Sequence, residues 1–215
     1  MMLTVSWNCR GLGNSTKPEA VKDFLKIETP DILMLQETKI EWVTLLDLSH
    51  TKWKLNVGKV VSARSSFGGL ATVWSEDMFE LVSYFETQHW ILTELCNELN
   101  KSSITLFNIY IPVHLIEKKE CWHTLYDFIE STSPSNIIIV RDLNLVFNSK
   151  EKRGGNTCCD QLMPYIEGLI QQWDLIDFKP KKGLYRWTNN RTSATRISSC
   201  LVRFLVHSTF LWIIN

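Results

Sequence analysis

Apolar and polar positions at the start of the chain switch between the period of a strand and the period of a helix. They predict a strand, a helix and a second strand, at residues 3–7, 18–27 and 31–35. Within the helix, Val21, Phe24 and Leu25 recur at i, i+3 and i+4, which gives it one apolar face to lay on a sheet. Pro18 suits the first turn of this helix. The opening of the chain is therefore α/β.

Short β-rich runs follow, at residues 53–57, 69–74, 80–85, 90–96 and 104–110. Turn residues such as Gly68-Gly69 separate two of them, and strands joined by short turns favour antiparallel pairing. Helical spacing returns at 117–131 and 160–173, on either side of an apolar strand from Ile137 to Val140. These patterns predict an α/β sandwich, with two mixed sheets packed face to face and helices outside.

Length and composition limit the classes of protein to which the chain can belong. At 215 residues and 45% hydrophobic content, we expect a single domain spanning residues 1–215. We find no signal-peptide pattern, no apolar run near the roughly 20 residues that span a bilayer, and no disulfide or zinc pattern among the six cysteines. We predict an intracellular monomer, in the nucleus or cytoplasm, without membrane association.

Charge gives weak support for bulk nucleic-acid binding. Basic and acidic residues are equal at 23 each, so no global positive field draws in a polyanion. The balance is uneven, because no acid follows Asp177 whereas basic residues continue from Lys179 to Arg203. This segment either faces a phosphate backbone, or is a solvated basic face or a damaged C-terminus.

Polar side chains at the ends of predicted strands carry the candidate chemistry. Asp142 and Asn144 follow the strand that ends at Val140, and Glu37 follows the strand that ends at Leu35. We expect the two acids to meet at one edge of a sheet and to hold a divalent metal. Asn8 closes the first strand where the chain turns. The sequence therefore predicts a metal-dependent phosphodiesterase site.

Several strings, read in order, strengthen this prediction: Trp7-Asn8-Cys9-Arg10-Gly11-Leu12-Gly13, Leu35-Gln36-Glu37-Thr38, Gly68-Gly69-Leu70-Ala71, Asn108-Ile109-Tyr110-Ile111-Pro112 and Asp142-Leu143-Asn144. Their order and spacing resemble the endonuclease/exonuclease/phosphatase superfamily. Further strings make the likeness closest to the endonuclease domain of plant LINE-type (non-LTR) retrotransposons: Glu151-Lys152-Arg153-Gly154-Gly155, Trp187-Thr188-Asn189-Asn190-Arg191 and Arg203-Phe204-Leu205-Val206. The resemblance implies a four-layer α/β sandwich and Mg²⁺-dependent nicking of DNA, with Mn²⁺ as an alternative ion.

The resemblance also implies roles for single residues. Glu37 is the main metal ligand and Asn8 its neighbour, Tyr110 contacts the phosphate, Asp142 orients or deprotonates the attacking water, and Asn144 donates to the phosphoryl oxygens. Each of these residues also has a purely structural alternative. Glu37 could be an ordinary acid at a strand end, and Asn8 could cap a turn. Tyr110 could be a plain strand aromatic, and Asp142 and Asn144 could form an Asx turn. Candidate nucleic-acid contacts are Arg10, Arg186, Asn190 and Arg191.

The chain departs from the family pattern at several positions. Arg141 stands where the family has glycine before its Asp-Phe-Asn, Arg186 replaces a threonine, and Val202 stands where the family has a catalytic aspartate. The family continues to a last strand and a Ser-Asp-His loop, whereas this chain stops at Asn215, so we expect an incomplete domain without the last strands and the catalytic histidine. Loss of a general acid or base typically costs about 10²- to 10⁴-fold in rate.

We therefore expect a degenerate endonuclease-like domain with low or no activity, whose partner, if it functions, is DNA. Two alternatives stay open. One is a working Mg²⁺-dependent DNA-nicking endonuclease. The other is a noncatalytic nucleic-acid-binding module that uses the segment from Lys179 to Arg203.

Overall fold

The structure is a computed structural model. It describes residues 2–13, 16–41, 43–44, 47, 57–63, 68–142, 151–154, 160–178, 187–188, 198–199 and 202–212, with residues 141–142, 187–188, 198–199, 202 and 211–212 described by their backbone alone. The chain divides into two compact units, Met1–Tyr110 and Ile111–Asn215. A single domain over residues 1–215 stays a prediction.

The first unit contains a four-stranded sheet in the order β1-β2-β4-β3, formed by β1 (Thr4–Asn8), β2 (Ile32–Gln36), β4 (Leu70–Trp74) and β3 (Val57–Val61). Strands β1 and β2 are parallel, whereas β4 is antiparallel to both β2 and β3. The strands predicted at 3–7, 31–35 and 69–74 are confirmed to within one residue at each end. The strand predicted at 53–57 lies outside the described residues except for Val57, and β3 is a strand that the sequence pattern did not predict.

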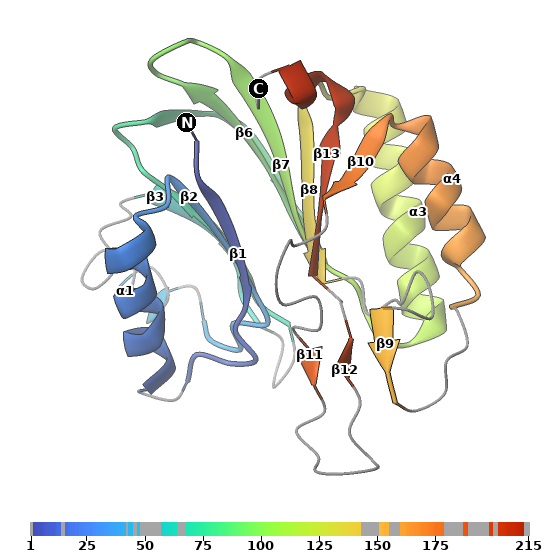
Figure 1. Cartoon of the computed structure of the whole chain (residues 1–215), viewed down its shortest axis with the longest axis horizontal. Coiled ribbons are helices and arrows are strands. Elements are labelled where there is room, and N and C mark those ends of the chain that lie inside the picture. The colour runs from blue at the N-terminus through green and yellow to red at the C-terminus, as the bar shows by residue number, and fades with distance from the viewer. Residues whose placement is uncertain are drawn as a thin grey trace. The chain divides into compact units, whose positions relative to one another are not determined.

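Helix α1 (Thr16–Glu28) covers one face of this sheet (Figure 1). Its Val21 and Leu25 are buried against apolar side chains of β2 and β4, as the spacing predicted. Phe24 meets Trp7 of β1 edge to face, with ring centroids 5.2 Å apart. Because Pro18 lies in the first turn, where its missing N–H costs no hydrogen bond, the helix tolerates it.

A second layer of the first unit consists of β5 (Phe79–Glu86), β6 (Trp90–Asn97) and β7 (Ser103–Tyr110), each antiparallel to the next. Strand β4 packs on β6 and β7, so the two layers lie face to face. The predicted antiparallel pairing is confirmed. With α1 on one face and the second layer on the other, both faces of β2 and β4 are covered, which accounts for the complete burial of these two strands.

The second unit contains the helices α3 (Leu115–Thr132) and α4 (Met163–Gln172), which lie side by side in Figure 1. Strand β8 (Ile137–Asp142) pairs with β13 (Val202–His207), which pairs with β10 (Leu175–Phe178), all antiparallel. A small sheet joins three two-residue strands: β11 (Trp187–Thr188), β12 (Ser198–Ser199) and β9 (Lys152–Arg153). A 3₁₀ helix, η4 (Ser208–Trp212), follows β13.

Helix α4 begins three residues later than predicted, because a proline occupies its first turn and Leu162 precedes it as the N-cap. The sequence pattern did not predict β10 and β13.

Overall, the chain has two mixed β-sheets, of four and six strands, flanked by helices, which confirms the predicted α/β sandwich. No helix within the described ranges combines the length and the apolar character needed to cross a bilayer.

Candidate metal-binding site

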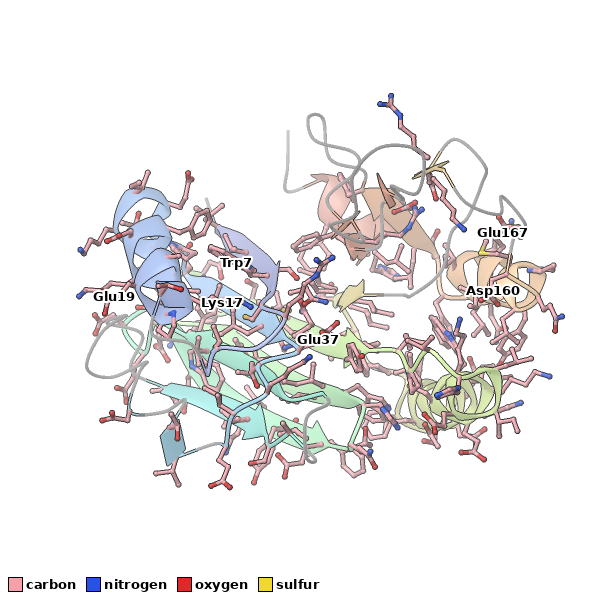
Figure 2. The ribbon with its side chains drawn as sticks, turned by 90° about the horizontal axis from the view of Figure 1, so that it is seen from below. Trp7, Lys17, Glu19, Glu37, Asp160 and Glu167 are labelled. Atoms are coloured by element: carbon pink, nitrogen blue, oxygen red, sulfur yellow. The ribbon has the colours of Figure 1, made fainter. Side chains whose placement is uncertain are left out.

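Glu37 lies immediately after β2, at the edge of the four-stranded sheet (Figure 2). All five residues of β2 are buried, whereas Glu37 is only half-buried. Its φ of 51° is left-handed, as is the φ of 54° at Lys39, and such a conformation costs a non-glycine residue of order 1–3 kcal/mol. The surrounding hydrogen bonds must therefore hold this carboxylate in place.

Backbone hydrogen bonds from two neighbouring loops hold the Glu37 segment. From the loop after β1, Gly11 N donates to Glu37 O at 2.7 Å and Leu12 N donates to Thr38 O at 2.7 Å. On the other side, Thr38 N donates to Gly69 O at 3.1 Å. Gly69 has a φ of +87°, and a Cβ added there would lie 2.3 Å from Thr38 Oγ1. Glycine is thus required at position 69 for the close approach of this loop to the Glu37 segment.

Asn8 connects the end of β1 to the carboxylate. Its Nδ2 donates to Glu37 Oε1 at 2.9 Å, and its Oδ1 accepts a hydrogen bond from Arg10 N at 3.1 Å. Because β1 and β2 are parallel neighbours, their carboxyl ends meet at one edge, and this places the two side chains together. Asn8 therefore caps the turn through its Oδ1 and holds Glu37 through its Nδ2.

These residues fit one mode of magnesium binding. Within the described part of the chain, no hydrogen bond or ion pair engages Glu37 Oε2. No three His, Cys, Asp or Glu side chains among the described residues gather to hold a metal. Mg²⁺ does not require such a cage, because one or two protein oxygens, waters and a substrate phosphate complete its shell.

Cys9, which lies between Asn8 and Arg10, is not a candidate ligand. The pKa of its thiol is raised to about 12, mainly by burial; the positive charge of Lys17 lowers it by a smaller amount, and the negative charge of Glu37 adds a smaller rise. The thiol therefore stays protonated at neutral pH, whereas metal ions bind the thiolate. Its Sγ lies 3.6 Å from Trp7 O.

A buried polar network beneath the edge links the two layers of the first unit. Gln36, fully buried, accepts a hydrogen bond from Ser6 Oγ at 3.1 Å and donates to Asn108 Oδ1 at 2.7 Å. Asn108 Nδ2 then donates to Ala71 O at 2.8 Å and to Leu35 O at 3.2 Å. These bonds fix β7 against β2 and β4. Sequence reasoning did not assign this role to Gln36 and Asn108; their only signal was that both lie inside motif strings next to Glu37 and Tyr110.

Tyr110 ends β7 two residues after Asn108. Alternation along a strand puts both side chains on the same face, the one that Asn108 uses to reach β2 and β4. Tyr110 is half-buried, and its N donates to His89 O at 2.9 Å. This arrangement places Tyr110 on the Glu37 side of β7, and its contact with phosphate stays a prediction.

Of the other predicted catalytic residues, the structure describes only Asp142, by its backbone, in the second unit. Asp142 is the last residue of β8, and its backbone pairs with that of Val202. Asn144 lies outside the described residues. Strands β2 and β8 belong to different sheets, so the expectation that Glu37 and Asp142 end strands of one sheet is wrong.

The predicted basic surface is only partly described. Arg186, Asn190 and Arg191 lie outside the described residues, and a nucleic-acid contact by Arg10 stays a prediction. Arg203, however, is 2% exposed, and its guanidinium is ion-paired with both Glu151 and Asp177. Arg203 is therefore a core residue, and the expectation that the basic segment extends to Arg203 as a phosphate-facing surface is wrong at this position.

Residues 5–197 match the sequence model of the Endonuclease/Exonuclease/phosphatase family. This span is most of the chain, so the chain belongs to that family, as its strings predicted. Nucleases of the family generally use divalent metal ions. None of the curated proteins compared with the chain matches it by sequence.

Solved nuclease structures share the fold. The endonuclease domain of TRAS1, a telomere-specific non-LTR retrotransposon, gives a TM-score of 0.70 at 13% identity, over 98% of this chain and 87% of its own. The Xenopus laevis APE2 catalytic domain gives 0.69 at 16%, over 98% and 84%. The Leishmania major AP endonuclease LMAP gives 0.68 at 18%, over 96% and 79%. At these identities the likeness shows the fold alone.

Proposed function

We propose that this chain is a retrotransposon-derived endonuclease-like domain, ancestrally a Mg²⁺-dependent DNA endonuclease, with low or no activity of its own. The observation that carries the proposal is the Asn8–Glu37 pair at 2.9 Å, which leaves one carboxylate oxygen facing no described partner. A carboxylate fixed by an amide at a sheet edge is suited to a hard divalent cation, with a substrate phosphate completing the ion's shell.

The residues have distinct roles in this proposal. Glu37 binds the ion, and Asn8 orients Glu37 and offers its own oxygen. Tyr110 donates a hydrogen bond from its phenolic hydroxyl to the phosphate of the scissile bond. Asp142 orients or deprotonates the attacking water, and Asn144 donates to the phosphoryl oxygens as charge builds up on them. When bound, Mg²⁺ or Mn²⁺ would serve as a Lewis acid toward the phosphoryl group.

Low activity follows from Val202. The resemblance expects an aspartate there, and the backbone register places Val202 directly opposite Asp142 on the neighbouring strand. Valine can neither accept a proton nor bind a cation, so the proposed base lacks an acidic partner at that position. Losing one such group removes about 10²- to 10⁴-fold in rate.

The Glu151–Arg203 ion pair supports the plant LINE-type ancestry. The two residues come from separate strings of that likeness and lie 52 positions apart, yet they meet in the core of the second unit. Both strings therefore describe one structural feature. DNA is the proposed partner, and a monomer in the nucleus or cytoplasm stays our prediction.

Nicking of supercoiled plasmid in Mg²⁺ tests the proposal. We expect nicking near the limit of detection for the wild-type chain and a rise of about 10²-fold or more for Val202→Asp. Val202→Asn is the matched control, because asparagine has nearly the same shape as aspartate but carries no charge. Adding Glu37→Ala to Val202→Asp, or adding EDTA, should return nicking to baseline. Equal nicking by the Val202→Asp and Val202→Asn variants would contradict the explanation for low activity.

The same assay separates the alternatives. Rapid nicking by the wild-type chain that Glu37→Ala abolishes would identify a working endonuclease. No nicking by any variant, together with salt-sensitive DNA retention that survives Glu37→Ala, would identify a noncatalytic binding module. Among the described residues no observation favours that module, because Arg203 is buried in ion pairs.

A further inference from the structure

We propose that Lys17 is a positioning residue of the metal site, which holds the turn at residues 8–11 in the conformation that keeps Asn8 on Glu37. The inference rests on the proposed function for its metal, and on hydrogen bonds of this chain for its geometry. Lys17 belongs to none of the strings that carry the family resemblance.

The turn after β1 has an unfavourable backbone. Arg10 has a φ of 49° and Gly11 a φ of 90°, so two successive residues are left-handed. Arginine rarely adopts this conformation without support from its surroundings. The support on one side is known: the N–H groups of residues 9, 11 and 12 donate to carbonyl oxygens of Gln36, Glu37 and Thr38.

Lys17 supplies the support on the other side. Its Nζ donates to Arg10 O at 2.7 Å and to Cys9 O at 3.1 Å, so a single ammonium group holds both carbonyls of the turn. Lys17 lies in the first turn of α1, next to the buried Pro18, and the buried apolar face of the helix fixes its position. In Figure 2 Lys17 projects from α1 toward the loop that carries Glu37.

Loss of the Lys17 hydrogen bonds would affect metal binding by changing the position of Asn8. If the carbonyls of Cys9 and Arg10 are released, Arg10 N can turn away from Asn8 Oδ1, and the carboxamide loses the hydrogen bond that anchors its oxygen to the turn. Glu37 then loses its fixed orientation. Residues that orient a metal ligand typically change metal affinity by 10- to 100-fold when they are removed.

A second effect of Lys17 opposes the first. Its positive charge lies close enough to the site to act on Cys9 together with the charge of Glu37, and a nearby ammonium repels a bound cation. Positioning therefore predicts weaker metal binding without Lys17, whereas repulsion predicts tighter binding. The ammonium directs its charge onto two carbonyl oxygens and is partly exposed to water, so we expect positioning to dominate.

The test uses Mn²⁺ as the probe, titrated into the full chain and followed by electron paramagnetic resonance. We expect Lys17→Met to weaken Mn²⁺ binding about tenfold, Lys17→Gln to weaken it less, and Lys17→Arg to restore it. Lys26→Met is the matched control, because Lys26 lies on the same helix, carries the same charge and pairs only with the exposed Asp23 within the described residues. It should leave binding unchanged.

Amide hydrogen exchange of the metal-free protein supplies a readout that does not depend on the ion. Lys17→Met should speed exchange at Gly11 and Leu12, and Lys17→Arg should not. If Lys17→Met fails to fold, Lys17→Gln takes its place. Unchanged exchange, or Mn²⁺ binding as tight as in the wild-type chain or tighter, would overturn the proposal. A wild-type chain that binds no Mn²⁺ at all would refute the proposed function, and hydrogen exchange would then decide the role of Lys17 alone.

Discussion

Removing the Arg203 guanidinium should destabilise the second unit strongly. Its side chain is 1% exposed and pairs with Glu151, whose side chain is 3% exposed, and with Asp177, whose side chain is 20% exposed. Arg203→Met keeps the length and the apolar stem of the side chain but leaves the two carboxylates without their shared cation. A buried carboxylate that loses its cation cannot recover its hydration in the core.

The size of the effect follows from this burial. Breaking a buried ion pair by removing one partner costs about 3–5 kcal/mol. With a urea m-value of about 2 kcal/mol/M, a loss of about 4 kcal/mol lowers the unfolding midpoint by about 2 M. Removing all three charges together, in Arg203→Met/Glu151→Gln/Asp177→Asn, should recover most of this loss, because neutral groups do not pay the desolvation penalty of ions.

Urea unfolding monitored by tryptophan fluorescence provides the assay, since Trp122 and Trp173 are buried in the second unit. Lys101→Met is the control, because it removes an exposed ion pair with Glu98 and should leave the midpoint unchanged. A midpoint for Arg203→Met within about 0.5 M of the wild-type value, or a triple variant no more stable than the single one, would refute this explanation of the buried pair.

The remaining predictions concern two glycines and two buried cysteines. Gly69→Ala should cost about 1–3 kcal/mol in the free energy of unfolding and weaken Mn²⁺ binding, because its Cβ would lie 2.3 Å from Thr38 Oγ1 at a φ of +87°. Gly168→Ala, in helix α4 with open space around it, should instead stabilise by about 0.5–1 kcal/mol, and urea unfolding checks both. Burial raises the pKa values of Cys9 and Cys121 from 9.0 to about 12, so their contribution to stability is full below pH 9 and is lost as the pH rises toward 12. Unfolding at pH 8, 9 and 10 should show this fall, and replacing both residues with alanine should flatten it; a stability that rises over this range would contradict the assignment.

Much of the fold was predictable because the burial of one face of a helix or strand requires apolar residues at a regular spacing in the sequence. The parallel strands β1 and β2 and the helix between them show both periods, and the structure confirms all three elements. Strand β13 escaped prediction because one of its buried positions is Arg203, which looks like a surface residue until its two carboxylates are known. Those carboxylates lie 52 and 26 positions away, beyond the reach of a local pattern.

Some features of the candidate site were likewise predictable from the sequence, and others were not. The approach of Asn8 to Glu37 was foreseeable, since parallel strands end at one edge of a sheet. The left-handed φ of Glu37 and the support from Gly69 could not be foreseen, because backbone strain does not change the pattern of apolar and polar residues along a strand. Lys17 was missed for another reason. A lysine in the first turn of an amphipathic helix looks like a solvated charge, and only the fold shows its ammonium on two carbonyls.

The central claim is that Glu37, oriented by Asn8, binds a divalent cation. Calorimetric titration of the full chain with Mg²⁺ and with Mn²⁺ tests it most directly, in the wild-type chain, in Glu37→Gln and in the control Glu28→Gln, which changes an exposed acid of α1. We predict that the wild-type chain and Glu28→Gln bind one ion equally well and that Glu37→Gln loses this binding. Binding by Glu37→Gln as tight as that of the wild-type chain would contradict the claim.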